Sequence, residues 1–122
     1  MEPQFSIYKC AESNFINKTS DASPTVADCR QIVYNIRKGG TWQVGAGSEH
    51  HQLVQYGTCA FGAQGTKFKI DTAFIGNQDI IDLINLSTDK FQSNGLVGAK
   101  GSMGCQSWTN MGVNMTWGLY HN

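Results

Sequence analysis

The chain has 122 residues, of which 40% are hydrophobic and 11% are aromatic, and nine basic residues balance nine acidic ones. This length fits a single domain, residues 1–122, and we expect a monomer. A net charge of zero with scattered lysines argues against nucleic acid as a partner, because nucleic-acid-binding surfaces are basic. No apolar stretch approaches the roughly 20 residues of a membrane-spanning helix.

The N-terminal segment is polar. Met1 stands before Glu2, Pro3 and Gln4 and looks like a start codon fused to a mature sequence, from which any original leader has been removed. Residues 1–22 are rich in Ser, Asn and Thr, so we expect a largely irregular segment, anchored by Phe5, Tyr8 and Phe15.

A first helix is predicted over residues 24–38. Ser23 is expected to cap it and Pro24 suits its first position. One apolar stripe has helical spacing and should face the core: Val26, Cys29, Val33 and Ile36. Gly39 and Gly40 should end the helix.

Short strands follow at residues 42–44, 51–57, 58–63 and 67–71. In the last of these, Phe68 and Ile70 alternate with Lys67, Lys69 and Asp71. Such alternation is typical of a sheet with one face in water.

A second helix is predicted over residues 77–91, capped by Asn77. Its inner face should hold Ile80, Leu83, Ile84 and Phe91. Two further strands are predicted at residues 96–100 and 111–120. In the last one, one set of side chains should point inward: Met111, Val113, Met115, Trp117 and Leu119.

This order of elements predicts an α+β fold. Two helices cannot sandwich a sheet that keeps one face in water, so both should pack on the same face. The expected architecture is a two-layer α/β sandwich with an antiparallel sheet.

Four cysteines lie far apart in the sequence and form no C-x-x-C motif. Their even number predicts two disulfides and an oxidising compartment. Four cysteines allow three pairings, between which sequence alone does not choose. Packing of the first helix on the strand at residues 58–63 favours Cys29–Cys59, which leaves Cys10–Cys105.

Three sequons, at Asn17, Asn85 and Asn114, match the acceptor pattern for N-glycosylation. Asn85 and Asn114 fall on the polar sides of their predicted elements, and Asn17 lies in the N-terminal segment. We expect all three to be accessible.

Several stretches resemble one protein family in order along the chain: CAESNFINKT, SPTVADC, YGTCAFG, IGNQDIIDLI, VGAKGSMGC and MTWGLY. They resemble the fungal secreted effectors known as the putative necrosis-inducing factor family, homologues of extracellular protein 2. All four cysteines stand where the family has them. The resemblance implies secretion into the host apoplast, a link to plant cell death, and a fold similar to that of fungal killer toxins.

The resemblance supplies no catalytic residue, cofactor or metal, and we expect none. Glu49, His50 and His51 alone hint at a site, as a metal or proton-transfer cluster. However, adjacent side chains in an extended segment point to opposite faces, which favours a solvated loop. Trp108 stands in a polar stretch, where the sequence favours packing within its loop and leaves an exposed partner contact as the alternative.

The sequence therefore favours a non-enzymatic effector that binds an unknown host plant protein or membrane component. A killer-toxin-like blocker of an ion channel is the first alternative. A small secreted hydrolase is the second, although no G-x-S-x-G or H-E-x-x-H motif occurs.

Overall fold

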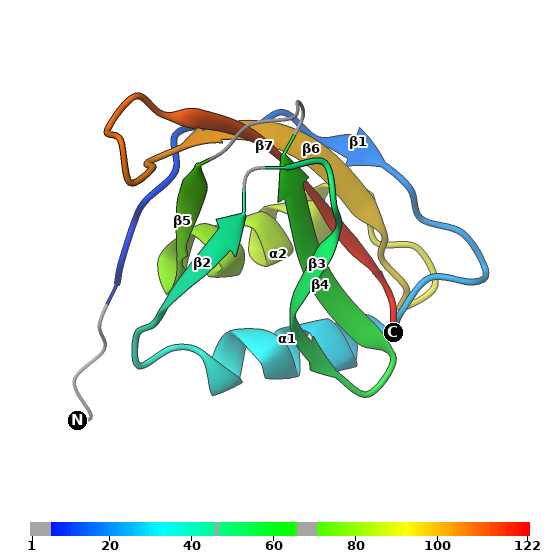
Figure 1. The fold of residues 1–122 in the computed structure, drawn as a ribbon. Helices are drawn as coiled ribbons and strands as arrows, with labels where there is room; N and C mark the ends of the chain where they lie inside the picture. The colour runs from blue at the N-terminus through cyan, green and yellow to red at the C-terminus, as the bar shows by residue number, and fades with distance from the viewer. Residues whose placement is uncertain (1–5, 46, 66–70) are drawn as a thin grey trace.

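The fold is shown by a computed structural model that describes residues 6–45, 47–65 and 71–122. In chain order the elements are β1 (Ile16–Asn17), α1 (Val26–Asn35), β2 (Thr41–Gly45), β3 (His51–Tyr56), β4 (Cys59–Gly65), β5 (Thr72–Gly76), α2 (Asn77–Phe91), β6 (Ala99–Cys105) and β7 (Val113–His121). Figure 1 shows these elements as one α+β fold, which confirms the predicted class. No helix in the described ranges has the length and apolar character needed to cross a membrane.

The strands form two antiparallel sheets where the sequence predicted one. The larger sheet has the order β1-β6-β7-β4-β3, and β2 pairs with β5 in a separate ribbon. Strand β5 was not predicted. Of the alternating stretch at residues 67–71, predicted to form a strand, residues 67–70 lie outside the described residues and Asp71 belongs to no strand.

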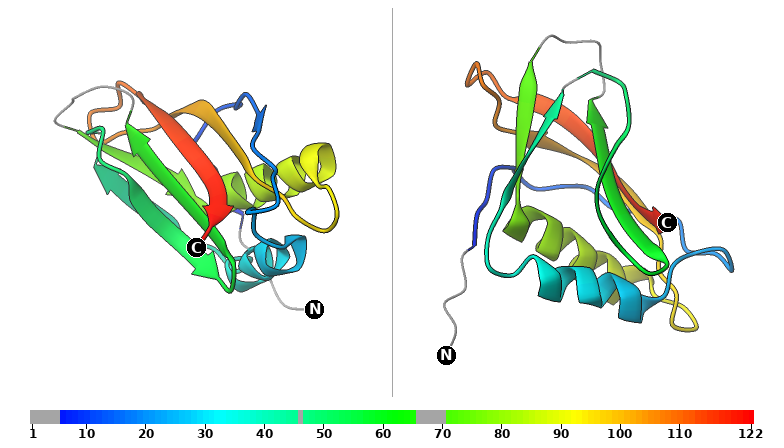
Figure 2. Two further views of the ribbon diagram at one scale, coloured as in Figure 1. Left: turned by 90° about the vertical axis from the view of Figure 1, so that its right-hand side faces the viewer. Right: turned by 60° about the horizontal axis from the view of Figure 1, so that its bottom comes forward.

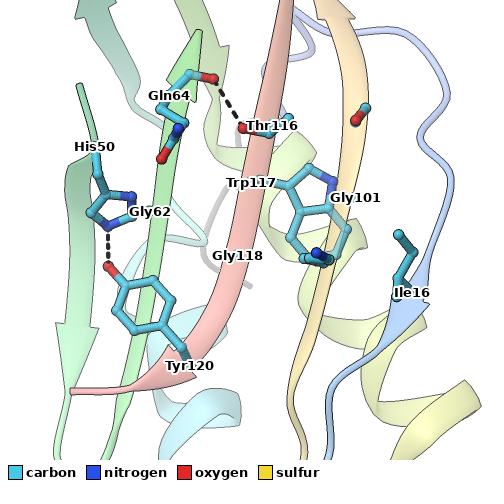
Figure 3. Close-up of a pocket in the computed structure, with 11 residues that line it drawn as sticks. Ile16, His50, Gly62, Gln64, Gly101, Thr116, Trp117, Gly118 and Tyr120 are labelled. Carbon is cyan, nitrogen blue, oxygen red and sulfur yellow. Dashed lines mark hydrogen bonds between the residues drawn. The ribbon is translucent and has the colours of Figure 1, made fainter. Parts of the chain in front are cut away.

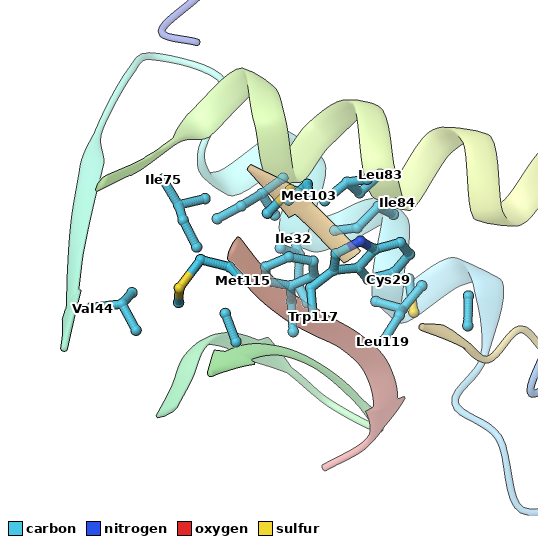
Figure 4. Packing of buried hydrophobic residues seen from close by; sticks show 14 of the residues in the cluster. Cys29, Ile32, Val44, Ile75, Leu83, Ile84, Met103, Met115, Trp117 and Leu119 are labelled. Carbon is cyan, nitrogen blue, oxygen red and sulfur yellow. The ribbon is translucent and has the colours of Figure 1, made fainter. Parts of the chain in front are cut away.

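Both helices cover the same face of the strands, as predicted. Helix α1 contacts β3 and β4, helix α2 contacts β5, and the two helices contact each other. Two views agree that the helices lie side by side beneath the strands (Figure 2). Figure 4 shows the resulting core, in which Ile32 of α1 and Ile84 of α2 meet Met115, Trp117 and Leu119 of β7.

Helix α1 is shorter than predicted and is capped by a different residue. Thr25 is the N-cap, and its hydroxyl accepts a hydrogen bond from the backbone N–H of Asp28 at 3.2 Å. Ser23 instead accepts from the backbone N–H of Ser20 in the preceding turn. Val26, Cys29 and Ile32 form the buried stripe, whereas Val33 and Ile36 are only half-buried.

Helix α2 has the predicted bounds, but Gly76 is its N-cap and Asn77 is its first helical residue. The Asn77 side chain is buried. Its Nδ2 donates to the carbonyl of Ile36, and its Oδ1 accepts from the backbone N–H of Ile7. Asn77 thus links the end of α1 to the N-terminal segment.

The alternation in β7 is confirmed for Val113, Met115, Trp117 and Leu119, all of which are buried. Met111 was predicted to point inward and is instead 84% exposed. The strand begins two residues after Met111, so the loop before it, and not the strand's inward face, sets the direction of that side chain.

The N-terminal segment is irregular but tied to β6. Ile16 pairs with Lys100 and Asn17 with Ala99. Phe15 anchors the segment as predicted, with its ring 5.6 Å from that of Trp117 in an edge-on contact. Tyr8 is not an anchor, because it is 58% exposed, and Phe5 lies outside the described residues.

The two disulfides are Cys10–Cys105 and Cys29–Cys59, which confirms the pairing predicted from packing. The first bridge fastens the N-terminal segment to the end of β6. The second fastens α1 to the start of β4, and both of its cysteines are fully buried.

Candidate functional site

Glu49, His50 and His51 do not form a metal site. Within the described ranges, no group of three or more histidine, cysteine or acidic side chains is placed to hold a metal ion. Glu49 and His50 lie exposed in the loop before β3, as the sequence favoured, but His50 is also held against the sheet, because its Nε2 lies 2.6 Å from the hydroxyl of Tyr120. The two rings meet edge-on with their centroids 5.4 Å apart.

A hydrogen-bonded chain extends from this pair. The Tyr120 hydroxyl donates to Oε1 of Gln52 at 3.0 Å, and Nε2 of Gln52 donates to Oδ1 of Asn122 at 3.0 Å. Because the tyrosine hydroxyl donates to Gln52, it accepts from His50. Burial raises the pKa of Tyr120, so the hydroxyl keeps its proton at neutral pH.

His50 and Tyr120 border a hollow of about 390 Å³ on the face of the larger sheet that points away from the helices. Figure 3 shows His50 and Tyr120 on one side of it, Gln64 and Thr116 near one end, and Ile16 on the far side. Gly62 and Gly118 lie opposite each other in the sheet register at its floor. We call this hollow the outer trough.

A second candidate is the loop at residues 106–112, between β6 and β7. Trp108 is 63% exposed and Met111 is 84% exposed. The exposure of Trp108 contradicts the packing within the loop that the sequence favoured and leaves the side chain open to a partner.

The 106–112 loop is held firmly by β5 and the segment before it. The backbone N–H of Trp108 donates to Thr72 O, and the N–H of Phe74 donates to Gln106 O. The hydroxyl of Thr109 donates to Oδ2 of Asp71 at 2.7 Å. This hydrogen bond, together with one from the backbone N–H of Thr72, lowers the pKa of Asp71.

A groove of about 490 Å³ lies between the N-terminal segment and α2, and its lining includes Glu12, Asp79 and Asp82. Burial raises the pKa of Asp79. Its Oδ2 accepts hydrogen bonds from the backbone N–H groups of Lys9 at 2.7 Å and Gly76 at 2.8 Å. Asp79 therefore caps α2 and holds the N-terminal segment.

All three sequon asparagines, Asn17, Asn85 and Asn114, are exposed, as predicted. Asn17 belongs to β1 and its side chain accepts from the backbone N–H of Thr19. In the second sequon the asparagine is exposed while Ser87 is buried.

Sequence reasoning missed the outer trough because its walls come from distant parts of the chain. His50 and Tyr120 are 70 positions apart. The one available signal was the outward alternation of Thr116, Gly118 and Tyr120, which marks a sheet face but does not say which residues lie beside it.

The chain is similar in sequence to known proteins. The sequence profile of the Hce2 family, described as "pathogen effector; putative necrosis-inducing factor", matches residues 9–105. A Penicillium expansum protein named "Probable chitinase LysM18" is 33% identical over 97% of this chain. A second from the same fungus, "Secreted chitinase LysM12", is 32% identical over 76% of it.

The chain spans only a small part of these relatives, about 8% of the first and 7% of the second. The family match, by contrast, covers most of the chain and takes in all four cysteines. The resemblance found in the sequence is thereby confirmed, and the chain belongs to the Hce2 family of pathogen effectors.

Proposed function

We propose that this chain is an extracellular effector that binds a host plant protein in the apoplast and so triggers cell death, without catalysing a reaction. The observation that carries the proposal is the 106–112 loop, which presents Trp108 and Met111 to solvent on a firmly held backbone. We call these two side chains the loop-tip contact.

Exposed Trp is unusual on a surface that meets only water, and Trp is among the residues that contribute most to binding at protein interfaces. Met adapts its shape to a partner. Because Asp71, Thr72 and Phe74 already hold the loop, binding would not have to order its backbone, and affinity gains from that preorganisation.

An extracellular location is supported by the two disulfides, which form and persist in oxidising compartments. The relative named "Secreted chitinase LysM12" supports it further, since its name places that protein outside the cell.

Hydrolysis is less well supported, although both relatives are named chitinases. Glycoside hydrolysis requires two carboxyl groups that can reach the scissile bond. Asp79 has the raised pKa of a catalytic acid, but backbone N–H groups of Lys9 and Gly76 occupy its Oδ2. We therefore assign Asp79 a structural role and attribute chitinase activity to the remainder of those much longer relatives.

The proposal is tested by measuring saturable binding of the labelled, disulfide-bonded protein to apoplastic and plasma-membrane fractions from leaves. Trp108→Ala and Met111→Ala should each weaken binding about tenfold or more, as expected for central interface residues. Tyr56→Ala is the matched control, because Tyr56 is an exposed aromatic on β3, away from the loop.

Protease treatment of the leaf fractions should abolish the binding if the partner is a protein. Binding that survives protease, or that Trp108→Ala leaves unchanged, would contradict the proposal. Current block in plant membranes at the same protein concentration would instead support the channel-blocking alternative.

A further inference from the structure

We propose that the outer trough binds a short, uncharged oligosaccharide through a set of amide and hydroxyl groups beside the Tyr120 and His50 rings. This site is separate from the loop-tip contact, and the proposal does not depend on the proposed cell-death function.

The first observation is that residues paired across neighbouring strands form rows on the outer face of the sheet. Gln64, Thr116 and Ser102 lie opposite one another on β4, β7 and β6, so their polar side chains form one row. In the next row Gly62 lies opposite Gly118. Neither glycine adds a side chain to this face: Gly62 is buried beneath the His50 and Tyr120 rings and Gly118 is half-buried, which leaves a depression along the polar row.

The second observation is that these glycines are required by the two rings. A Cβ atom on Gly62 would lie 2.6 Å from His50 Nε2 and 2.7 Å from the Tyr120 hydroxyl. A Cβ atom on Gly118 would lie 3.3 Å from Tyr120 Cδ1. The rings therefore lie low against the sheet, where a side chain would lift them, and they form a wall whose orientation the Gln52 hydrogen bond fixes.

The third observation is that several polar groups lining the trough have no partner among the residues that the structure describes. The Gln64 amide, the Ser102 hydroxyl and the Lys100 ammonium group make no hydrogen bond or ion pair with any described residue. Amides and hydroxyls both donate and accept hydrogen bonds, as the hydroxyl groups of a sugar do. Pockets with a few converging polar groups are the usual sites of small ligands.

The trough lining carries few charged groups, which favours an uncharged ligand. Lys100 is the one lysine or arginine among the trough residues, and no acidic residue is among them. A polyanionic chain would require a row of cations, and the described lining has no such row.

The length of the trough suits an extended ligand. The trough reaches from His50, before β3, to Ile16 on β1, so it crosses a five-stranded sheet of about 19 Å at ordinary strand spacing. This span suits a chain of several sugar units better than a single sugar.

Calorimetric titration of the disulfide-bonded, unglycosylated protein tests the proposal, because a glycan at Asn114 would occupy the same face of β7. The probes are a short chitin oligosaccharide, a cellulose oligosaccharide of equal length and an oligogalacturonate. We expect saturable binding of one or both uncharged probes. Binding of the charged probe alone, or of none of the three, would overturn the proposal.

Substitutions then locate the site. Gln64→Ala removes an amide that makes no bond to described residues, so it should weaken binding about three- to tenfold while leaving the unfolding midpoint unchanged. Tyr120→Ala should weaken it at least as much. Gln31→Ala, on α1 beneath the opposite face of the sheet, is the matched control and should have no effect.

Amide NMR shifts supply an independent readout that a change in folding would not mimic. Ligand addition should move the signals of Gly62, Ser102 and Gly118 and leave those of α1 in place. Shifts confined to the helices, or equal losses of affinity in Gln64→Ala and Gln31→Ala, would overturn the assignment of the trough.

Discussion

The carboxylate of Asp28 accepts two hydrogen bonds from Thr58, one from its backbone N–H and one from its hydroxyl, both at 2.8 Å. The next residue on each side completes the Cys29–Cys59 disulfide. Two consecutive residue pairs thus join α1 to the β3–β4 turn, one by hydrogen bonds and one covalently. This joint explains why a cysteine, Cys29, occupies the buried stripe of an amphipathic helix.

The Asp28–Thr58 pair should make stability depend on pH. Hydrogen bonds from Thr58 hold the pKa of Asp28 below its usual range. The stabilisation is therefore present above the unfolded-state pKa of about 3.9 and is lost as pH falls through the lower folded-state pKa. Asp28→Asn should lower the urea midpoint at pH 7, and its difference from wild type should shrink in acid.

Asp89→Asn is the matched control for this experiment, because Asp89 is an exposed carboxylate on α2. It should leave the urea midpoint unchanged at both pH values. A wild-type to Asp28→Asn difference that stays constant into acid would show that the charge of Asp28 does not contribute.

Gly57 makes the same joint sensitive to one added methyl group. It has φ +53°, and a Cβ atom there would lie 2.7 Å from Cγ of Asp28. The left-handed conformation alone costs a non-glycine residue about 1–2 kcal/mol, so Gly57→Ala should lose at least this much free energy of unfolding. Gly104→Ala, where the added atom meets nothing within 4 Å, should stay near wild type in the same denaturant titration.

The Cys29–Cys59 bridge should contribute about 3–4 kcal/mol on the chain-entropy account, since it closes a loop of 30 residues. The double variant Cys29→Ala/Cys59→Ala should lose about this free energy of unfolding and most of its biological activity at leaf temperature. Peptide mapping without reduction checks the pairing in the wild-type protein, and a Cys10–Cys29 peptide would contradict it.

Glycan occupancy at Asn17, Asn85 and Asn114 is expected when the protein passes through a eukaryotic secretory pathway, because all three asparagines are exposed. Intact mass before and after enzymatic deglycosylation measures it. A secreted product with the mass of the bare polypeptide would argue against use of these sequons.

Much of the fold follows from local patterns in the sequence. The inward alternation of Val113 to Leu119 and the apolar stripe of α2 were readable because each pattern persists over several turns or pairs. The disulfide pairing followed once Cys29 was placed on the inner face of a helix. These features depend on contacts that a periodic pattern describes well.

Other features depend on where each element starts and on how distant strands pair, which no local sequence pattern encodes. Thr25, and not Ser23, is the N-cap of α1: the helix begins at Val26, and Thr25 has the extended backbone conformation that an N-cap needs. Met111 points outward because β7 starts after it. The outer trough joins His50 to Tyr120 through strand order, which places β3 beside β4 and β4 beside β7.

The central claim is that the folded protein triggers cell death through a bound partner at the loop-tip contact and not through an active site. The most direct measurement is infiltration of responsive leaves with wild-type, Trp108→Ala and His50→Ala proteins at matched concentration, each verified as folded by circular dichroism. We predict that His50→Ala causes necrosis like wild type and that Trp108→Ala does not. Necrosis that persists in Trp108→Ala, or that disappears in folded His50→Ala, would contradict this account.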